Sequence, residues 1–228
     1  MFVSLGSAVG LGYTARVAMK RKPNVEERRR VLCDAAIEIL ALEGARGLTH
    51  RKVERQAGLP DGTTSSYFRT RSALLQATAE RVAELDAAEF EAVTRQLPQS
   101  ETATTTLALL AQMVMRSASG VGLDRSRARY ELAFHSRRDA VLRRTLEDNI
   151  AGFVALSEQA VAQVPFDGPV DPALVEEQAY AVTTFLNGVM VRQVIGDPRL
   201  ETAEELTRLL HALVAGVAAS HHVHASQV

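Results

Sequence analysis

Apolar residues recur along nearly the whole chain at the period of an α-helix, about 3.6 residues. Between positions 24 and 43, for example, one face carries Leu32, Ala35, Ala36, Ile39 and Leu42. Gly44 and Gly47 then offer a place for the helix to end. No segment combines strict apolar and polar alternation with the β-branched residues of a strand. The pattern therefore predicts an all-α fold of about nine helices.

Capping and helix-breaking residues set the expected helix boundaries. Thr49, Thr70 and Asp171 are suitable N-caps, and Pro172 takes the first helical position after Asp171. Gly120 and Gly122 are expected to interrupt the chain between two helices. The expected helices lie at about 24–43, 49–56, 61–68, 70–97, 107–114, 126–136, 142–164, 171–195 and 206–217. The seventh is expected to bury Leu142, Leu146, Ile150, Phe153, Val161 and Val164.

Charge is distributed unevenly along the 228 residues, although the formal net charge is only −1. Residues 20–72 hold 12 Lys and Arg against 7 Asp and Glu, whereas residues 73–228 hold 13 against 20. A local positive field attracts phosphates whatever the rest of the chain carries, so a basic head and an acidic body are indicated, although surface charge also clusters by chance. The basic arm at 20–22 can follow a nucleic-acid backbone or stay solvated.

The single cysteine and the two ends of the chain argue against a disulfide-stabilised protein, a membrane protein and a metal-binding tail. Cys33 stands among apolar residues and cannot form a disulfide within the chain, which fits a reducing cytoplasm and a small buried side chain rather than a redox sensor. The apolar N-terminus lacks the basic start of a signal peptide, and no stretch reaches the roughly 20 apolar residues of a membrane span. We expect residues 1–23 to be a disordered extension, with Met19 as an alternative start to Met1, and 221–228 to be a solvated tail whose histidines bind no metal.

The most informative segment, residues 47–71, reads GLTHRKVERQAGLPDGTTSSYFRTR. Two short helices separated by a tight turn at Ala57-Gly58-Leu59 match the helix-turn-helix layout. Its apolar side chains can pack inward, which leaves the small polar residues of the second short helix free to enter a major groove. Basic residues on either side can hold the sugar-phosphate backbone. They are Arg51, Lys52, Arg69 and Arg71.

At these residues the chain resembles the TetR family of bacterial transcription regulators. The resemblance rests on Thr49, Arg51, Val53, Ala57-Gly58-Leu59, Gly62-Thr63, Tyr67-Phe68, Arg69 and Arg71, between Glu43-Gly44 and Ala73-Leu74-Leu75. It is specific over about 50 residues, and the rest agrees in helix number, length and order. It implies a three-helix head at 24–72 with its motif at 49–68, a connecting helix at 73–97, and a ligand-binding and dimerisation body at 98–220.

The resemblance also implies which residues meet double-stranded operator DNA: Thr49, His50, Arg51, Gly62, Thr63, Ser65, Ser66, Tyr67, Arg69 and Arg71. Arg51 can read a guanine edge, and Arg71 is expected on a phosphate. Two residues depart from the family pattern. Pro60 stands where a Ser or Thr N-cap is common, and Ser65 stands where an aromatic is common, so the start of the recognition helix and one backbone contact differ. Tyr67 is equally suited to packing between helices.

A single head makes few phosphate contacts, so we expect the body to supply a two-fold axis. The helix at 171–195 is apolar on more than one face, which is too wide a stripe for the core of one monomer. With the last helix it is expected to form a four-helix bundle across a homodimer axis, as the resemblance implies; a fully internal helix in a monomer is the alternative. The candidate interface residues are Leu186, Val189, Met190, Leu209 and Leu213.

The resemblance places an effector pocket among the middle helices of the body. The candidate lining residues are Met113, Tyr130, Phe134, Phe153, Phe185 and Asn187. An apolar chamber with few polar anchors suits a lipophilic small molecule, although for any single one of these side chains ordinary core is the favoured alternative.

These features predict a cytoplasmic, homodimeric DNA-binding regulator, most simply a repressor that a small lipophilic effector releases from its operator. A transcriptional activator, or a regulator controlled by a protein partner, is the alternative. The sequence has no Ser/His/Asp spacing, phosphate loop or clustered metal ligands, so neither catalysis nor a metal or cofactor is expected. His135 and Asp139, four residues apart, are more simply a surface pair.

Overall fold

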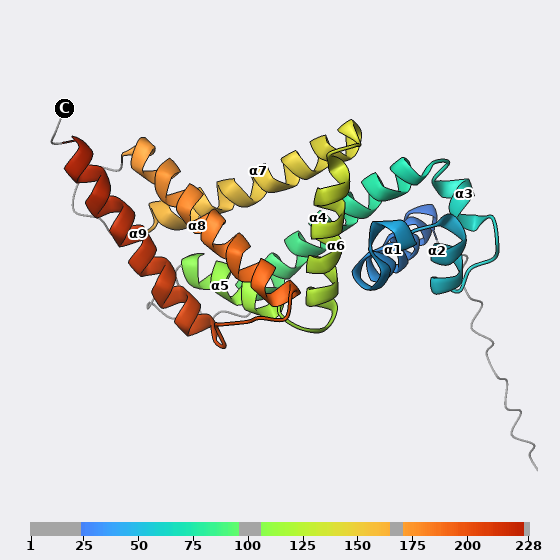
Figure 1. Cartoon of the computed structure of the whole chain (residues 1–228), viewed down its shortest axis with the longest axis horizontal. Helices are drawn as coiled ribbons and strands as arrows, with labels where there is room; N and C mark the ends of the chain where they lie inside the picture. The colour runs from blue at the N-terminus through green and yellow to red at the C-terminus, as the bar shows by residue number, and fades with distance from the viewer. Residues whose placement is uncertain (1–23, 96–105, 165–170, 226–228) are drawn as a thin grey trace, which may run out of the picture.

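The computed structural model describes residues 24–95, 106–164 and 171–225, with side chains described as far as His221. Within these residues the chain forms α-helices and no strand, which confirms the all-α prediction (Figure 1). The predicted N-terminal extension and its basic arm, the junction at 96–105 and the last three residues lie outside the described residues. The helices are α1 (Val25–Gly47), α2 (His50–Gln56), α3 (Thr63–Tyr67), α4 (Arg71–Arg95), α5 (Thr106–Arg116), α6 (Gly120–Ser136), α7 (Ala140–Ala162), α8 (Pro172–Val194) and α9 (Ala203–Ala225).

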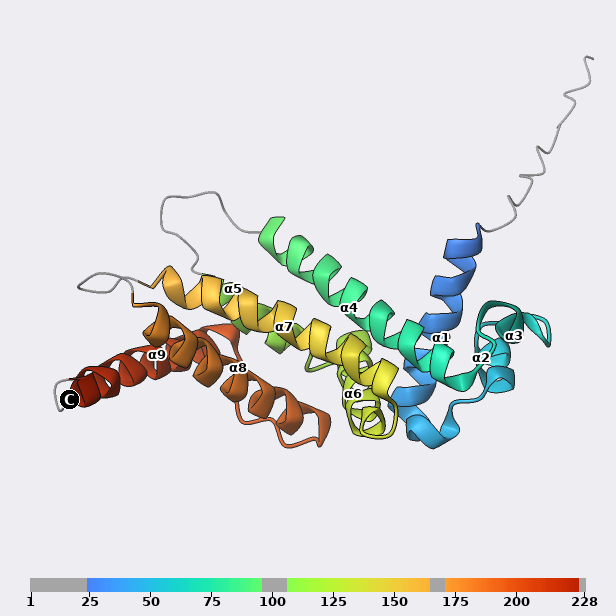
Figure 2. The same ribbon diagram turned by 90° about the horizontal axis from the view of Figure 1, so that it is seen from above.

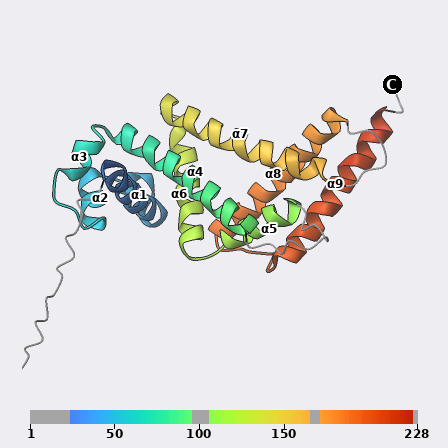
Figure 3. The ribbon, with the colours of Figure 1, turned by 180° about the vertical axis from the view of Figure 1, so that it is seen from behind.

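The helices form an elongated molecule with a small head at one end (Figure 1). Helices α1, α2 and α3 make the head, and α4 leaves it to run alongside α7 into the body (Figure 2). Helix α6 crosses between the two parts and packs extensively against α1. Seen from behind, α8 and α9 form the outer side of the body, at the end farthest from the head (Figure 3). The head is thus joined to the body through both α4 and α6.

The head is organised around the apolar face of α1 that the sequence pattern indicates. Leu32, Ala36 and Leu40 are fully buried there and pack with residues of α2, α4 and α6. The expectation that Leu42 shares this face is wrong, since Leu42 is 77% exposed. The helix ends where Gly44 takes a left-handed conformation, with φ of 68°, before one further turn. The guanidinium of Arg29 lies 4.7 Å from the ring centre of Phe68, which attaches the residue after α3 to α1.

The body has its own apolar core, built from α5, α7, α8 and α9. Leu110 of α5, Leu186 of α8 and Leu210 of α9 are all fully buried in it. Among the described residues no single helix has the length and apolar character needed to cross a membrane; α5 and α6 together meet those criteria, but as a pair bent by 91°.

Three sequence expectations for the body are wrong. Helix α6 begins at Gly120, and Gly122 lies inside it, because the absence of a side chain there lets the backbone of Arg116 approach. Ile150 is 59% exposed rather than a core residue of α7. Residues 221–225 continue α9 instead of forming a tail. His221 lies within hydrogen-bonding distance of Asp171, which directly precedes α8, and of Glu177 on α8.

Candidate DNA interface and effector cavity

Helices α2 and α3 form the predicted helix-turn-helix. The hydroxyl of Thr49 caps α2 by accepting a hydrogen bond from the backbone N–H of Lys52 at 3.3 Å. The turn then needs two left-handed residues, Gly58 at φ 64° and Gly62 at φ 85°, which glycine adopts without a steric penalty. The position of these two glycines fixes how α3 crosses α2.

Glu54 supplies the cap that the sequence of α3 lacks. Helix α3 begins at Thr63, after Pro60 and Gly62, and its N-cap residue makes no side-chain hydrogen bond. Instead, the carboxylate of Glu54 on α2 accepts a hydrogen bond from the backbone N–H of Thr64 at 2.8 Å, and this acid is only 3% exposed. Sequence reasoning missed this residue, although a single acid on the buried side of a short helix is a recognisable signal for an internal acceptor.

The outer surface of the head combines free cations with small polar side chains. Arg51 and Arg69 are exposed and make no ion pair within the described part of the chain. Ser65 and Ser66 lie exposed on α3 between them, and Ser66 donates its hydroxyl hydrogen to the carbonyl oxygen of Gly62. A helix with short polar side chains and flanking guanidinium groups has the shape and charge that a major groove accepts.

Two residues predicted to contact DNA, Arg71 and His50, have hydrogen-bond partners inside the protein, so a DNA contact by either of them stays a prediction. Arg71 turns inward: its guanidinium donates to the carbonyl oxygens of Ala45 and Leu48 and to Nε2 of His135 on α6. The carbonyl groups at the end of α1 have no partner within their own helix, so they attract this cation. The ring of His50 is also occupied, since its Nε2 donates to the carbonyl oxygen of Phe68 at 2.8 Å.

The remaining predicted contacts are mixed in character. Thr63 is half-buried and donates its hydroxyl hydrogen to the carbonyl oxygen of Pro60 at 2.6 Å, within the turn. Tyr67 is half-buried and packs against the apolar core of the head, which agrees with the alternative that this residue packs between helices. A DNA contact by either residue therefore stays a prediction.

A cavity of about 240 Å³ lies where α4, α5, α6, α7 and α8 meet. Its walls are largely apolar, with Val82, Leu132, Phe153 and Met190 among them. Typical small-molecule sites occupy about 300–1,000 Å³. This cavity is slightly smaller than that range, so it suits a compact molecule. It lies beside α6, the same helix that packs against the head.

One wall of the cavity consists of two arginines of α6 and two acids of α4. Arg125 pairs with Asp86, with 2.9 Å between Nε and Oδ1, and with Glu89. Arg129 pairs with the second oxygen of Asp86, at 2.6 Å. The side chain of Arg125 is only 11% exposed, and burial lowers its pKa. Sequence pattern alone does not predict this network, because more than thirty residues separate its acids from its arginines along the chain.

The cavity brings together four of the six predicted lining residues, Met113, Tyr130, Phe153 and Asn187. The other two lie elsewhere. Phe134 is 74% exposed on α6, because the face of that helix toward the cavity is taken by Arg129 and Tyr130. Phe185 lines a separate groove between α8 and α9. That the cavity binds an effector stays a prediction.

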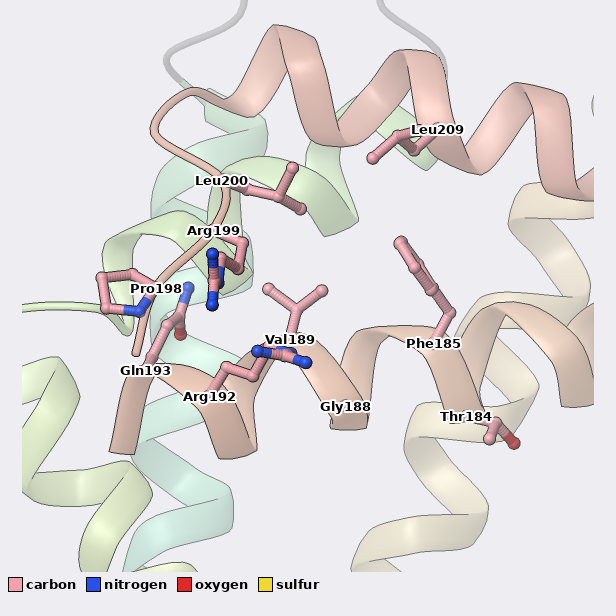
Figure 4. Close-up of a pocket in the computed structure, with 10 residues that line it drawn as sticks. All are labelled: Thr184, Phe185, Gly188, Val189, Arg192, Gln193, Pro198, Arg199, Leu200 and Leu209. Atoms are coloured by element: carbon pink, nitrogen blue, oxygen red, sulfur yellow. The ribbon is translucent and has the colours of Figure 1, made fainter. Parts of the chain in front are cut away.

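A separate groove lies between α8 and the segment that leads into α9 (Figure 4). Phe185 and Val189 extend from α8 toward Leu209 of α9, which lies across the groove. Two of the predicted interface residues do not belong to this surface. Leu186 is fully buried in the core of the monomer, and Met190 lines the cavity where α4 to α8 meet. Leu213 is half-buried against the body core.

A helix-turn-helix head joined by α4 to a helical body defines a DNA-binding transcription regulator. Residues 101–216 match the family model described as the tetracyclin repressor-like, C-terminal domain. The chain therefore belongs to the TetR family. No curated protein sequence matches the chain.

Solved structures agree with this assignment. A putative TetR-family transcriptional regulator from Rhodococcus sp. superposes with a TM-score of 0.64 at 20% identity, covering 84% of this chain and 98% of that one. A TetR-family member from Streptomyces coelicolor A3 superposes with a TM-score of 0.62 at 25% identity, covering 82% and 98%. The multidrug binding protein EbrR complexed with ethidium superposes with a TM-score of 0.58 at 25% identity, covering 82% and 98%.

Proposed function

We propose that the protein is a homodimeric repressor whose two heads bind an operator and whose cavity binds a small molecule that releases it. The observation that carries the proposal is the position of α6. One stretch of this helix lines the cavity through Arg125, Arg129 and Tyr130, and the next residues contact the head. A molecule in the cavity therefore lies against the element on which the head rests.

The contacts between α6 and the head are directional and specific. The carboxylate of Glu131 accepts a hydrogen bond from the backbone N–H of Ala45 at 2.8 Å. One turn further along, Nε2 of His135 accepts from the guanidinium of Arg71, 3.3 Å away. The first contact reaches the end of α1 and the second reaches the start of α4, on either side of the helix-turn-helix, so a shift of α6 along its axis would change the orientation of the helix-turn-helix.

Helix α4 provides a second connection. It carries Asp86 and Glu89 at the cavity and begins at Arg71, directly after the helix-turn-helix. Since α4 and α6 are joined by the ion pairs at the cavity wall, they are expected to move together. A ligand can shift the heads only by binding one arrangement better than the other, and a typical coupling of about 1–3 kcal/mol changes operator affinity about 5–150-fold.

A homodimer supplies the second head. Helix-turn-helix dimers bind two half-sites about one DNA turn apart, so the spacing between the heads decides whether both can bind at once. The apolar groove formed by Phe185, Val189 and Leu209 supports an interface built from α8 and α9. An effector that changes the spacing between the heads would then weaken the complex without blocking the DNA-binding surface itself.

The relatives support a cavity that accepts small molecules. EbrR, crystallised with ethidium, is described as a multidrug binding protein and shares the fold of this chain over most of its length. That description is a property of EbrR. For this chain it supports a small-molecule effector, which the cavity of about 240 Å³ has room to bind.

The proposal is tested by fluorescence anisotropy with the intergenic DNA upstream of the protein's own gene. We expect tight, salt-sensitive binding in preference to random DNA of equal length. Arg51→Ala should weaken binding to that DNA, whereas Arg144→Ala, an exposed arginine on α7 in the body, should leave it unchanged. Equal binding of the two DNAs would refute the DNA-binding part of the proposal. In a deletion strain, a promoter reporter should rise, and a fall would identify an activator.

A further inference from the structure

The charged groups at the cavity compensate one another. Two arginines and two carboxylates contribute to its lining, and every carboxylate among them has an arginine partner. Arginine remains protonated in proteins, so the four groups sum to zero charge. The arginines of α6 pair with the carboxylates of α4, so no uncompensated charge is left for a ligand.

This balance matters because the groups are shielded from water. The side chain of Arg125 is 11% exposed and that of Glu89 is 19% exposed. An ion that enters such a site loses its hydration, and the loss is recovered only if a group of opposite charge is available to it. A ligand cation would have to displace Arg125 or Arg129 from its carboxylate, and a ligand anion would have to displace Asp86 or Glu89 from its arginine.

Three neutral groups in the cavity have unused hydrogen-bonding capacity. Among the charged groups of the described residues, Nε of Arg125 also lacks a hydrogen-bond partner, although its charge is compensated by Oδ1 of Asp86 at 2.9 Å. The amide nitrogen of Asn149 donates to the carbonyl oxygen of Ala79 at 3.3 Å, which leaves its amide oxygen as an acceptor. The side-chain amide of Asn187 has no hydrogen-bond partner within the described part of the chain. The hydroxyl of Tyr130 makes only a long contact, 3.3 Å, with the backbone carbonyl oxygen of Asn187. These groups can pair with a hydroxyl or carbonyl group of a ligand.

We propose that the cavity selects a compact, uncharged and mostly apolar molecule with one hydroxyl or carbonyl group, and discriminates against organic cations and carboxylates. The inference rests on the proposed function, since it assumes that the cavity is the effector site. The volume of about 240 Å³ and the apolar walls set the size and character of the molecule. The internal pairing of the charged residues sets its charge.

The test uses three probes built on one ring system: naphthalene-2-methanol, naphthalene-2-methylamine and naphthalene-2-carboxylate, which are neutral, cationic and anionic at pH 7. Their affinities for the full-length protein are measured by isothermal titration calorimetry. We expect the alcohol to bind at least about tenfold more tightly than either ion, a ratio that corresponds to about 1.4 kcal/mol. Ethidium, a permanent cation, is expected to bind more weakly than the alcohol.

Two variants test whether the charge balance is the cause. Glu89→Gln leaves one arginine charge uncompensated and should improve binding of the carboxylate probe about tenfold or more relative to the alcohol. Arg125→Met leaves one carboxylate uncompensated and should do the same for the amine. Glu147→Gln is the matched control, because Glu147 is exposed on α7 and pairs with Arg143 away from the cavity. Far-ultraviolet circular dichroism verifies that each variant is folded. If Arg125→Met does not fold, the test rests on the Glu89→Gln result alone.

Each other outcome overturns the inference in a distinct way. An amine or ethidium affinity equal to that of the alcohol would show that the cavity does not select by charge, and would leave a small-molecule site in place. Unchanged probe preference in folded Glu89→Gln would remove the charge balance as the cause. If no probe binds while the anisotropy assay still shows operator binding, the cavity is not a site for neutral molecules, although the DNA-binding part of the proposed function stands.

Discussion

The carboxylate of Glu131 on α6 accepts a hydrogen bond from the backbone N–H of Ala45 at 2.8 Å, at the point where α1 ends. The two residues are 86 positions apart in the sequence, and their contact joins the body to the head. It lies next to Gly44, whose left-handed conformation turns this N–H away from its own helix. An outside acceptor is therefore required at this position.

Glu131→Ala should lower the free energy of unfolding by about 1–2 kcal/mol, because the N–H of Ala45 loses a charged acceptor in a half-buried place. Glu131→Gln should lose less, since the amide oxygen can still accept. Urea unfolding measures both variants, and Glu147→Ala on the exposed side of α7 serves as the control. If Glu131→Ala is as stable as the control, the contact does not hold the head.

Glu54→Ala should weaken operator binding although Glu54 is buried and does not face DNA. Its carboxylate accepts from the N–H of Thr64, and α3 is only five residues long, so loss of this cap affects a large part of the helix. The expected cost is about 1–2 kcal/mol of head stability. Operator affinity and thermal melting are measured together, and Glu54→Gln should recover most of both. A variant that melts earlier and binds normally would separate the cap from recognition.

Asp139→Asn should change how stability depends on pH. A hydrogen bond from Ser72, and then that from the backbone N–H of Leu142, lowers the pKa of Asp139 in the folded state. The stabilisation is therefore present above the ordinary pKa of an aspartate, about 3.9, and is lost as the pH falls through the lowered value. The melting temperatures of wild type and Asp139→Asn should differ at pH 7 and converge below about pH 4. Asp148→Asn on the exposed side of α7 is the control for charge removal.

Cys33 should resist thiol reagents while the protein is folded. Burial raises the pKa of its thiol to about 12, and the side chain is 4% exposed. On the order of one molecule in ten thousand then carries a thiolate at pH 8, and the reagent cannot reach it. Ellman's reagent should label the protein only in denaturant. Rapid labelling of the native protein would show that the core of the head opens readily.

Leu209→Lys should convert the proposed homodimer to a monomer and abolish operator binding at concentrations where wild type binds. Leu209 is half-buried beside an apolar groove, so a lysine at this position can reach solvent in the monomer but would introduce an unpaired charge into an interface. Light scattering coupled to size exclusion measures the mass. Val141→Lys, which replaces an exposed valine on α7, is the control and should remain dimeric. A dimeric Leu209→Lys would place the interface elsewhere.

The sequence by itself determined the features that depend on neighbouring residues. The caps predicted at Thr49, Thr70 and Asp171 all accept the expected hydrogen bonds, from the N–H groups of Lys52, Ala73 and Ala173. Each bond joins residues two or three positions apart, so the local sequence contains both partners. The same holds for the turn at Gly58 and for the family motif around it.

Tertiary structure alone decided which side chains face inward and which ions pair. Arg71 carries the guanidinium group typical of a phosphate ligand, yet it donates to the carbonyl oxygens of Ala45 and Leu48, because the end of α1 leaves carbonyl groups without a partner in their own helix. Leu186 and Leu209 are the same amino acid on outer helices of the body, but the packing of α8 buries the first in the monomer and leaves the second at the groove. The pairing of Arg125 with Asp86 and Glu89, which sets the charge of the cavity, arises where α6 crosses α4. A helical period identifies an apolar face, but the residues opposite it come from distant segments, and those contacts form only when the helices pack.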